Sequence, residues 1–334
     1  MKQLSIIVPA YNVEKYLEKT LASLSVHELS DKLEVLVIND GSKDSTESIA
    51  RRFCEAEPQI FRLIGKENGG HGSAVNEGMK RMEGRYARVI DGDDWADRNA
   101  LTRLISALES TDADLTIDER TEYSEKTSIE TRFPLPEKIK ANEKTDFAPY
   151  AEKSMIPFYT IHTITMKREL IRNRNIVLDE GMFYVDYELA LCATSAAQTV
   201  FFMRNDVHRY RIGVNTQSVS NESYVRNYRM HRRVVAFAAS FAEAGNYNES
   251  RSEYVRASVV SIINMHLNIL LILDKNKKRG RERAYGFMLW LNKKHPHFEK
   301  AAKKRYLAAL ALNLMSVGGN GLERLRGVIS AKKR

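Results

Sequence analysis

Two continuous apolar runs, at residues 5–10 and 33–39, constrain the fold of this chain more than any other feature of its sequence. Both runs are rich in Ile and Val, and leucines recur at helical spacing between them. A strand that is apolar along its whole length is typical of a sheet that helices cover on both faces. The alternation continues with apolar runs at 60–65 and 86–90 and helical patterns at 45–55 and 73–82. It predicts an α/β fold on a doubly wound, mostly parallel sheet.

The pattern changes twice further along the chain. From residue 114 to about 149 it is mixed, charged and interrupted by prolines, which indicates irregular strands and loops. Two further strands with a helix between them are expected within 158–211, and after residue 221 only helical patterns follow. We therefore expect an α/β domain over residues 1–221 and a C-terminal α-helical domain over residues 222–334.

Composition places the chain among globular proteins. With 334 residues and 43% hydrophobic content it can bury a large core. The first apolar run is short and leads into polar residues rather than a small-residue cleavage site, so no secretory signal peptide is indicated. Cys54 and Cys192 lack the spacing of a zinc site or a redox motif. We expect a cytoplasmic protein with two free thiols.

Charge is distributed unevenly along the sequence. Residues 275–334 hold 17 Lys/Arg against 3 Asp/Glu, whereas residues 1–274 hold 35 against 40, for a net charge of +9. A basic tail on a mildly acidic body indicates contact with an anionic surface, which is either lipid headgroups or nucleic acid. Anionic lipid would hold the protein peripherally on the inner face of the cell membrane. A solvated face on terminal helices has the same composition.

Polar and glycine-rich segments follow each of the first four predicted strands. In chain order they are Pro9-Ala10-Tyr11-Asn12, Asn39-Asp40-Gly41-Ser42, Asn68-Gly69-Gly70-His71-Gly72 and Asp91-Gly92-Asp93-Asp94. Ligands of doubly wound sheets bind at the carboxyl ends of the strands. We therefore expect the four segments to converge on one crevice.

The last of these segments carries the strongest signal for chemistry. Asp91, Asp93 and Asp94 place three carboxylates within four residues, and Gly92 permits a tight turn. Mutual repulsion makes this arrangement costly without a cation, and hard oxygen ligands suit Mg²⁺ or Mn²⁺, which also bind substrate phosphates. The alternative interpretation is an Asp-rich surface turn.

The other segments give weaker signals. Turn chemistry alone selects an Asn-Asp-Gly-Ser sequence, but Asp40 at a strand end is placed to accept from the imide N–H of a uracil ring. Asn68 and Gly70 lie in a segment that leads into a helix N-terminus, which favours phosphate binding. His71 and His162 fall in crevice loops, where each is either functional or simply packed.

Four segments, in this order and spacing, resemble glycosyltransferase family 2: IIVPAYN, VLVINDGSKDST, KENGGHGSAVNEG and IDGDDW. The resemblance covers residues 4 to about 220. It implies a GT-A fold, a UDP-sugar donor, Mn²⁺ or Mg²⁺ bound at a DxD motif, and transfer with inversion at the anomeric carbon.

The resemblance also implies roles for individual residues. It places Pro9, Tyr11 and Asp40 around the uracil ring, Asp91 at the ribose, Asp93 on the metal, and Asn68, Gly70, Gly92 and Arg211 in the remainder of the nucleotide-sugar site. Asp94 becomes a supporting or acceptor-side carboxylate. The sequence departs from the family at Ala74-Val75-Asn76, where many relatives carry Arg before the Asn, so a phosphate contact is either absent or supplied by Lys66 or Arg211.

Inversion by a single displacement needs a base that takes the proton of the attacking acceptor hydroxyl. The family places this base in a Glu-Asp pair at a helix start about a hundred residues downstream, where Asp186 stands here. Val185 replaces the usual Glu, which puts the partner of Asp186 in doubt and makes Glu188 a second candidate. Asp186 also fits a helix N-cap.

Together these observations predict an inverting hexosyl- or N-acetylhexosaminyltransferase. The resemblance implies a saccharide or lipid-linked saccharide acceptor and a place in bacterial surface polysaccharide assembly. Two alternatives remain open at this stage: a metal-dependent nucleotidyltransferase or nucleic-acid-processing protein that uses the basic tail, and a nucleotide-sugar-binding protein without transfer activity.

Overall fold

The computed structural model describes residues 2–213 and 219–316, and the chain divides into two compact units, Met1–Val214 and Asn215–Arg334. The first unit is a sheet with helices, and the second is helical, as expected. The predicted boundary after residue 221 lies a few residues beyond this division, at the start of the first C-terminal helix, and stays a prediction.

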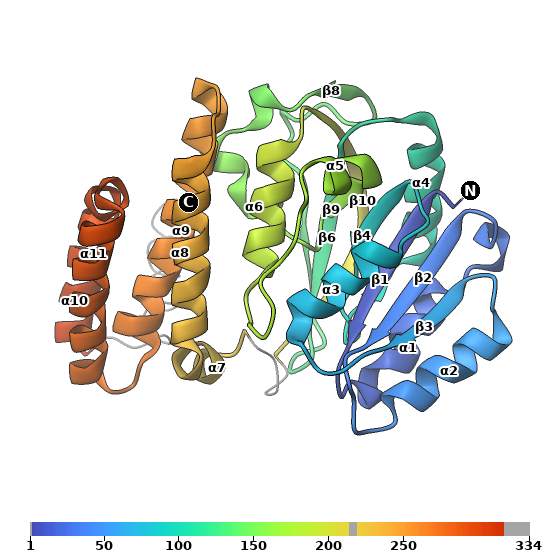
Figure 1. The fold of residues 1–334 in the computed structure, drawn as a ribbon, viewed down its shortest axis with the longest axis horizontal. Coiled ribbons are helices and arrows are strands. Elements are labelled where there is room, and N and C mark those ends of the chain that lie inside the picture. The colour runs from blue at the N-terminus through green and yellow to red at the C-terminus, as the bar shows by residue number, and fades with distance from the viewer. Residues whose placement is uncertain (1, 214–218, 317–334) are drawn as a thin grey trace. The chain divides into compact units, whose positions relative to one another are not determined.

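The first unit contains one ten-stranded sheet in the described residues. Its strands are β1 (Leu4–Ala10), β2 (Leu33–Asn39), β3 (Phe61–Gly65), β4 (Tyr86–Val89), β5 (Trp95–Ala96), β6 (Leu115–Ser124), β7 (Glu130–Phe133), β8 (Lys144–Asp146), β9 (Ile164–Lys167) and β10 (Thr199–Ile212). They lie in the order β3-β2-β1-β4-β9-β6-β10-β5, with β7 beside β6 and β8 beside β10. Figure 1 shows β3, β2, β1 and β4 side by side.

The predicted α/β fold is confirmed, but the sheet is mixed rather than mostly parallel. Strands β1, β2, β3 and β4 pair in parallel, as do β6 and β10. Strand β9 runs antiparallel to both of its neighbours, β4 and β6, and therefore joins the two parallel groups. The reason is its connection: β9 is entered from an irregular excursion after β8 rather than through a crossover helix, which parallel pairing requires.

Helices cover both faces of the sheet, which explains why every residue of β1 and β2 is buried. The helices of this unit are α1 (Glu14–Leu24), α2 (Thr46–Ala56), α3 (Gly70–Arg81), α4 (Arg98–Ser110), α5 (Arg168–Asn173) and α6 (Asp186–Ala196), with short 3₁₀ turns at His27–Leu29, Ala148–Tyr150 and Lys153–Phe158. Leucines of α1 and α4 form one core with alternate residues of β1 and β2. Helix α3 covers the other face, where Gly78 lies directly on Ile7.

The second unit is a helical bundle. It contains α7 (Asn221–Arg226), α8 (Tyr228–Ala244), α9 (Glu249–Asn268) with a π-helical turn at Ile269–Leu273, α10 (Lys277–Lys294) and α11 (Pro296–Leu314). Helix α9 with its extension is the one described helix long and apolar enough to cross a membrane by length and composition, but 61% of its most apolar window is buried. That burial is typical of the central helix of a bundle.

Candidate active site

The carboxylate turn that follows β4 is held from beneath by backbone and hydroxyl contacts. The Gly92 amide donates to the carbonyl of Pro9 at 3.1 Å, and the Thr20 hydroxyl of α1 donates to the carbonyls of Gly92 at 3.0 Å and Asp94 at 2.5 Å. A Cβ at position 92 would lie 3.0 Å from the Pro9 carbonyl, so glycine lets the turn approach β1 closely. The turn is therefore a rigid part of the sheet edge.

The three carboxylates of this turn occupy different environments. Asp91 and Asp93 are partly exposed, whereas Asp94 is buried and accepts from the Arg211 amide at 2.8 Å and from His208 Nε2 at 2.7 Å. Burial raises the pKa of Asp94 well above its usual range, and the charges of Asp93 and Asp91 raise it further. Asp94 is thus an internal anchor between the turn and β10, while the other two carboxylates face outward.

His71 pairs with Asp91 at the start of α3. The Nε2 atom of His71 lies 2.8 Å from Oδ1 of Asp91. Burial alone would lower the pKa of His71, but the nearby carboxylates of Asp91, Asp186 and Asp93 raise it overall. The same pair lowers the pKa of Asp91 despite burial. The surrounding carboxylates therefore favour the protonated form of His71, and its interaction with Asp186 connects the turn to the predicted base.

Asp40 lies at the carboxyl end of β2, as predicted, but its carboxylate binds protein groups. Its Oδ1 accepts from Lys66 Nζ at 2.8 Å and the Gly69 amide at 2.9 Å, and its Oδ2 accepts from the Gly70 amide at 2.8 Å. Asn68 adds a bond from its Nδ2 to the Asp40 carbonyl at 2.9 Å. The glycine amides expected near phosphates are therefore taken by Asp40.

This capping also corrects the predicted start of the third helix. The helical pattern indicates a start at residue 73, whereas α3 begins at Gly70. Gly70 has a φ of 84°, which glycine adopts without strain. Asp40 supplies the helix-capping carboxylate from 30 residues upstream, and such a distant partner leaves no trace in the local pattern.

A loop that leads into α6 carries Asp186 to the same edge of the sheet. Asn76 of α3 donates to the Leu178 carbonyl and accepts from the Leu178 amide, both at 2.9 Å. A Cβ on Gly72 would lie 2.2 Å from the Asp179 carbonyl, so the loop rests on the first turn of α3. The Gly181 amide donates to the Gly69 carbonyl at 2.6 Å. These contacts fix the loop along its length.

Asp186 is the first residue of α6 and is partly buried. Burial raises its pKa, His71 lowers it and Asp91 raises it again, with a net rise above the usual range. Tyr184, two residues earlier, has a φ of 71°, a left-handed conformation that costs a non-glycine residue about 1 kcal/mol or more. Strained backbone of this kind is common at functional sites and here sets the direction of entry into α6.

Glu188, the second candidate for the base, is buried in the structure. Its side chain is 1% exposed, and its Oε2 accepts from the Asp179 amide at 3.0 Å. A carboxylate so enclosed has no surface to offer an acceptor hydroxyl. Glu188 instead holds the loop that precedes Asp186. Val185, which stands where the family has Glu, is buried as well.

Arg211 of β10 lies under the carboxylate turn. Its Nε donates to the Asp93 carbonyl at 2.7 Å, and its guanidinium also pairs with Glu125. The guanidinium carbon lies 4.7 Å from the ring centre of Tyr16 and 4.9 Å from that of Trp95, which is a cation–π arrangement. Arg211 is thus close to the predicted metal ligand and fixes the backbone that carries it.

A buried polar group lies behind the turn. Asp94, His162 and His208 place one potential ligand atom each within 4.8 Å of one another. Burial lowers the pKa of His162 to about 4 and that of His208 well below its usual range, so both rings are neutral near pH 7. Neutral imidazole and carboxylate are suitable metal ligands. This group is a second possible metal site, although Asp94 is already engaged by His208 and the Arg211 amide.

Arg88 of β4 and Asp118 of β6 form a buried ion pair across β9, which lies between these two strands. Two guanidinium nitrogens of Arg88 donate to the two oxygens of Asp118, at 2.9 and 3.0 Å, and both side chains are fully buried. Arg88 also donates to the His162 carbonyl and to the Thr165 hydroxyl. The pair supports the strands below His162, and burial raises the pKa of Asp118 to about 7.

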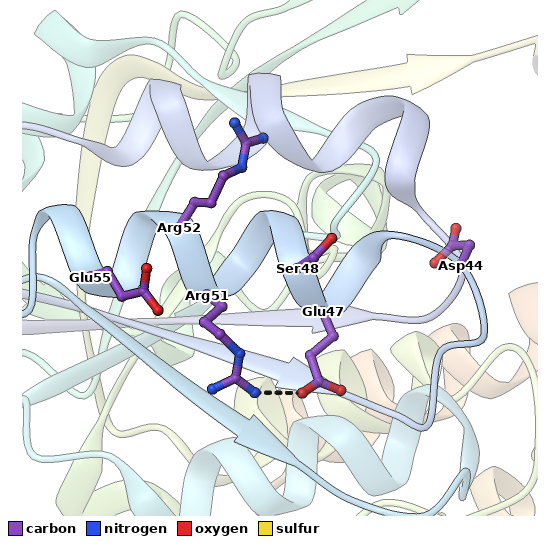
Figure 2. Close-up of a pocket in the computed structure, with 6 residues that line it drawn as sticks. All are labelled: Asp44, Glu47, Ser48, Arg51, Arg52 and Glu55. Atoms are coloured by element: carbon purple, nitrogen blue, oxygen red, sulfur yellow. Dashed lines mark hydrogen bonds and ion pairs between the residues drawn. The ribbon is translucent and has the colours of Figure 1, made fainter.

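A surface hollow on α2 lies apart from these residues. It has a volume of about 330 Å³ and is lined by Asp44, Glu47, Ser48, Arg51, Arg52 and Glu55. Figure 2 shows the Glu47–Arg51 ion pair across its floor. All lining residues come from α2 and the turn before it, and none belongs to the carboxylate turn or to the Asp186 loop. The hollow is a charged helix surface rather than the active site.

Most of the predicted site residues meet at one edge of the sheet. Pro9 contacts Gly92, Asn68 and Gly70 contact Asp40, Arg211 contacts Asp93, and Asp91 connects through His71 to Asp186. Tyr11 follows β1 with 47% of its surface exposed, as expected for a residue that stacks on a ligand. Sequence signals for His71 were weak, and none indicated Asn76 as the support of the Asp186 loop.

Comparison with known proteins gives a consistent result. A model of the family described as glycosyl transferase family 2 matches residues 5–174. The chain is 29% identical over 264 residues to the uncharacterized glycosyltransferase EpsJ of Bacillus subtilis (strain 168), which covers 75% of this chain and 74% of that protein.

Two solved structures show the same fold. The S. aureus TarS 1-349 structure in complex with UDP-GlcNAc has a TM-score of 0.67 at 16% identity and covers 94% of this chain and 92% of that one. The mannosyltransferase PcManGT from Pyrobaculum calidifontis, in complex with GDP-Man and Mn²⁺, has a TM-score of 0.55 at 18% identity, with coverage of 93% and 87%. Since the matching family model and the B. subtilis relative are both described as glycosyltransferases, the nucleic-acid-processing alternative is unsupported.

Proposed function

The chain belongs to glycosyl transferase family 2 and is a glycosyltransferase of GT-A-like fold, and from this premise we propose that it transfers a sugar from a UDP-sugar to a saccharide or lipid-linked saccharide with inversion. One observation carries the proposal. A partly exposed carboxylate with a raised pKa, Asp186, lies beside the His71–Asp91 pair at the carboxyl end of the strands. That is where a base and a donor site must adjoin for direct displacement.

The donor nucleotide binds between the ends of β1, β2 and β4. Tyr11 stacks on the uracil ring beside Pro9. Asp40 is 2% exposed and bound to Lys66 and to the Gly69 and Gly70 amides, so it holds the loop beside the ring rather than meeting the imide N–H predicted for it. His71 holds Oδ1 of Asp91, so Oδ2 of Asp91 accepts from a ribose hydroxyl. The two solved neighbours are complexes with UDP-GlcNAc and with GDP-Man, so an experiment must identify the nucleobase of the donor, uracil or guanine.

The carboxylate turn has the donor set for Mn²⁺ or Mg²⁺. Asp93 is partly exposed, its backbone is fixed by Arg211, and the charges of Asp93 and Asp91 already raise the pKa of buried Asp94, so the turn carries negative charge that a cation would offset. Asp93 would hold the ion together with diphosphate oxygens. When bound, the ion stabilises the negative charge that develops on the departing diphosphate.

Asp186 is the general base. It takes the proton from the acceptor hydroxyl while that oxygen attacks the anomeric carbon, and the bond from this carbon to the diphosphate oxygen breaks on the opposite side. A raised pKa makes Asp186 a stronger base than an exposed aspartate. The imidazolium of His71 is close enough to keep the carboxylate ionised and to offset part of the charge on the diphosphate.

The acceptor and the cellular setting complete the proposal. The acceptor is a saccharide or lipid-linked saccharide of bacterial surface polysaccharide assembly, and the enzyme works in the cytoplasm. The acceptor class follows from the motif resemblance of residues 4 to about 220. Assays should therefore offer short saccharides and lipid-linked saccharides as acceptors.

Calorimetric titration of UDP and of GDP, with and without Mn²⁺, tests the donor site. We expect UDP binding that needs Mn²⁺ and is lost in Asp93→Ala, but persists in Asp31→Asn, an exposed carboxylate before β2 that serves as the charge-matched control. His162→Phe keeps an aromatic ring against Tyr210 while removing a ligand of the buried group. If metal-dependent binding is lost in His162→Phe but not in Asp93→Ala, the metal site is the buried group of Asp94, His162 and His208 instead.

A second measurement addresses the stereochemistry of the transfer. With the preferred nucleotide sugar in hand, the anomeric configuration of the product identifies inversion or retention by NMR. Retention would reject the single displacement. UDP binding that is unchanged by Asp93→Ala and by removal of Mn²⁺ would reject the metal assignment.

A further inference from the structure

The last two described helices expose an unusual share of large apolar side chains. Ten such side chains are exposed in the described residues, and five of them lie on α10, on α11 or just after it. They are Tyr285 (60% exposed), Leu289 (53%), Leu307 (55%), Leu314 (64%) and Met315 (74%). Single exposed apolar residues need no explanation, but a cluster of them marks an interaction surface.

The spacing of these residues puts them on one face of each helix. Tyr285 and Leu289 are four residues apart on α10, and Leu307 and Leu314 are seven apart on α11 with exposed Ala311 between them. Residues at these intervals lie above one another on a helix.

The two helices form an antiparallel hairpin that unites these faces. Arg281 near the start of α10 donates to Asn313 near the end of α11 at 2.8 Å, and the chain reverses at His295. Burial raises the pKa of Tyr306 on α11, and Tyr285 on α10 adds to the rise, so the two hydroxyls lie within electrostatic reach of each other across the hairpin. Figure 1 shows α10 and α11 side by side. We call this surface, with residues 285, 289, 307, 311 and 314, the hairpin face.

The two helices that form the hairpin face also carry many exposed lysines. Residues 275–316 contain 12 Lys/Arg and only 2 Asp/Glu. Several arginines bind within the bundle: Arg279 and Arg283 pair with buried Asp274, and Arg305 donates to Asn268. Six exposed lysines have no ion pair with an acid in the described part of the chain, namely Lys278, Lys293, Lys294, Lys300, Lys303 and Lys304. Their charge is available to a partner.

We propose that the hairpin face binds the surface of an anionic lipid bilayer. Leucines next to lysines, with a tyrosine among them, are the composition of helices that lie in the interface of a membrane: the apolar side chains enter the acyl boundary and the ammonium groups meet the headgroups. Nucleic acid would engage the lysines but leave the leucines in water. A second copy of this chain would place six lysines against the same six lysines, which is unfavourable at a self-complementary interface.

The proposal is independent of the transferase chemistry, because binding to vesicles needs neither donor nor acceptor. The test is flotation of the full chain with vesicles of phosphatidylcholine alone or mixed with phosphatidylglycerol. We expect flotation with the mixed vesicles only, weakened by 0.5 M salt because surface charges are then screened. Removing two lysines in Lys303→Gln/Lys304→Gln should weaken binding by about fivefold per charge.

The apolar half of the hairpin face is tested by Leu289→Ser/Leu307→Ser. The matched control is Ile129→Ser/Val177→Ser, since these side chains are 60% and 56% exposed and lie in the first unit. We expect roughly tenfold weaker vesicle binding for the first pair and no change for the control. Lys80→Gln/Lys140→Gln, two exposed lysines of the first unit, controls for the loss of charge. Thermal unfolding and UDP binding should be unchanged in all four variants.

Three outcomes would overturn the proposal. The first is equal flotation of wild type and Leu289→Ser/Leu307→Ser. The second is a wild-type dimer, detected by light scattering, that this variant dissociates while flotation persists, because the hairpin face would then join two copies. The third is binding to DNA or RNA without binding to anionic vesicles. Since UDP binding is measured separately, failure of the donor site and failure of lipid binding are distinguishable.

Discussion

Asn76 exchanges two hydrogen bonds with the backbone of Leu178, one from its Nδ2 to the carbonyl and one to its Oδ1 from the amide, each 2.9 Å long. This pairing ties α3, which carries His71, to the loop that carries Asp186. Together with the backbone bond from Gly181 to Gly69, this side chain, which contacts no reacting atom, therefore holds the base and the donor side of the site in register.

Asn76→Ala removes both bonds. We expect the free energy of unfolding to fall by about 1–3 kcal/mol, because two backbone groups lose a partner. We also expect kcat to fall roughly tenfold, since displacement depends on the position of the base, while the Kd of UDP changes little. Urea denaturation, initial rates and calorimetry measure these effects. Asn99→Ala, on the exposed side of α4, is the control. A wild-type kcat in Asn76→Ala would refute the positioning role.

Asp186→Asn removes the proposed base without changing its shape. General base catalysis contributes about 10²–10⁴-fold, so we expect kcat to fall within that range while UDP still binds. Because the pKa of Asp186 is raised, wild-type activity should be lost as pH falls through a value above that of an ordinary aspartate. The residual activity of Asp186→Asn should lack this acid limb. An unchanged acid limb in the variant would assign it to another group.

The same shift predicts the effect of Asp186 on stability. A folded-state pKa above the unfolded value means that ionised Asp186 is less favourable in the folded protein. Its contribution favours the fold at low pH and is lost as pH rises through the folded pKa. Asp186→Asn should therefore be as stable as wild type or slightly more stable at pH 7, measured by urea denaturation. A marked loss of stability would show that the carboxylate is structural.

His71→Ala is expected to move two affinities in opposite directions. The imidazolium lies near Asp91, Asp93 and Asp186, so its removal leaves more negative charge at the turn. Mn²⁺ should bind about fivefold more tightly and UDP about fivefold more weakly, since the charges are close but partly exposed to water. His71→Gln, which keeps a donor but not the charge, should show the same affinity changes with Asp91 still oriented. Calorimetry with Mn²⁺ and with UDP measures both affinities. If both rise or both fall, the charge argument is refuted.

Arg88→Met tests the buried ion pair below His162. It leaves the Asp118 carboxylate buried without its partner, which typically costs about 3–5 kcal/mol. The double variant Arg88→Met/Asp118→Leu removes both charges and should recover most of that loss. Chemical denaturation of wild type, both single variants and the double variant gives the coupling energy. If the double variant is as unstable as Arg88→Met alone, the two side chains are not energetically coupled.

The first four strands could be predicted because their residues repeat one property. Every position of β1 and β2 is buried, so each strand is apolar throughout and needs no knowledge of its neighbours. Strand β6 could not be read this way, because Asp118, Glu119 and Thr121 are buried in it. Their partners are side chains of other strands, which the pattern of β6 does not reveal: Arg88, Arg132 and Asp206. The antiparallel entry of β9 was equally hidden, since pairing direction depends on the path of the chain.

In the candidate site, too, features that depend on local pattern could be predicted and features that depend on distant contacts could not. Asp91, Asp93 and Asp40 could be predicted because they end strands, and the strand pattern is local. The partners of Asp40 and the burial of Glu188 depend on contacts between segments far apart in sequence. His71 illustrates the limit: its position in a crevice loop was visible, but its bond with Asp91 depends on how α3 meets the carboxylate turn.

The sequence separation of Asn76 and Leu178 affects the order in which parts of the protein fold during synthesis. The two residues are 102 positions apart, and closing so long a loop is entropically costly, so this contact should form late in folding. Strands β1 to β4, with the carboxylate turn, leave the ribosome within the first hundred residues. A nascent chain should therefore form the β1 to β4 side of its nucleotide pocket before either Arg211 or Asp186 is in place, and so before it is able to transfer a sugar.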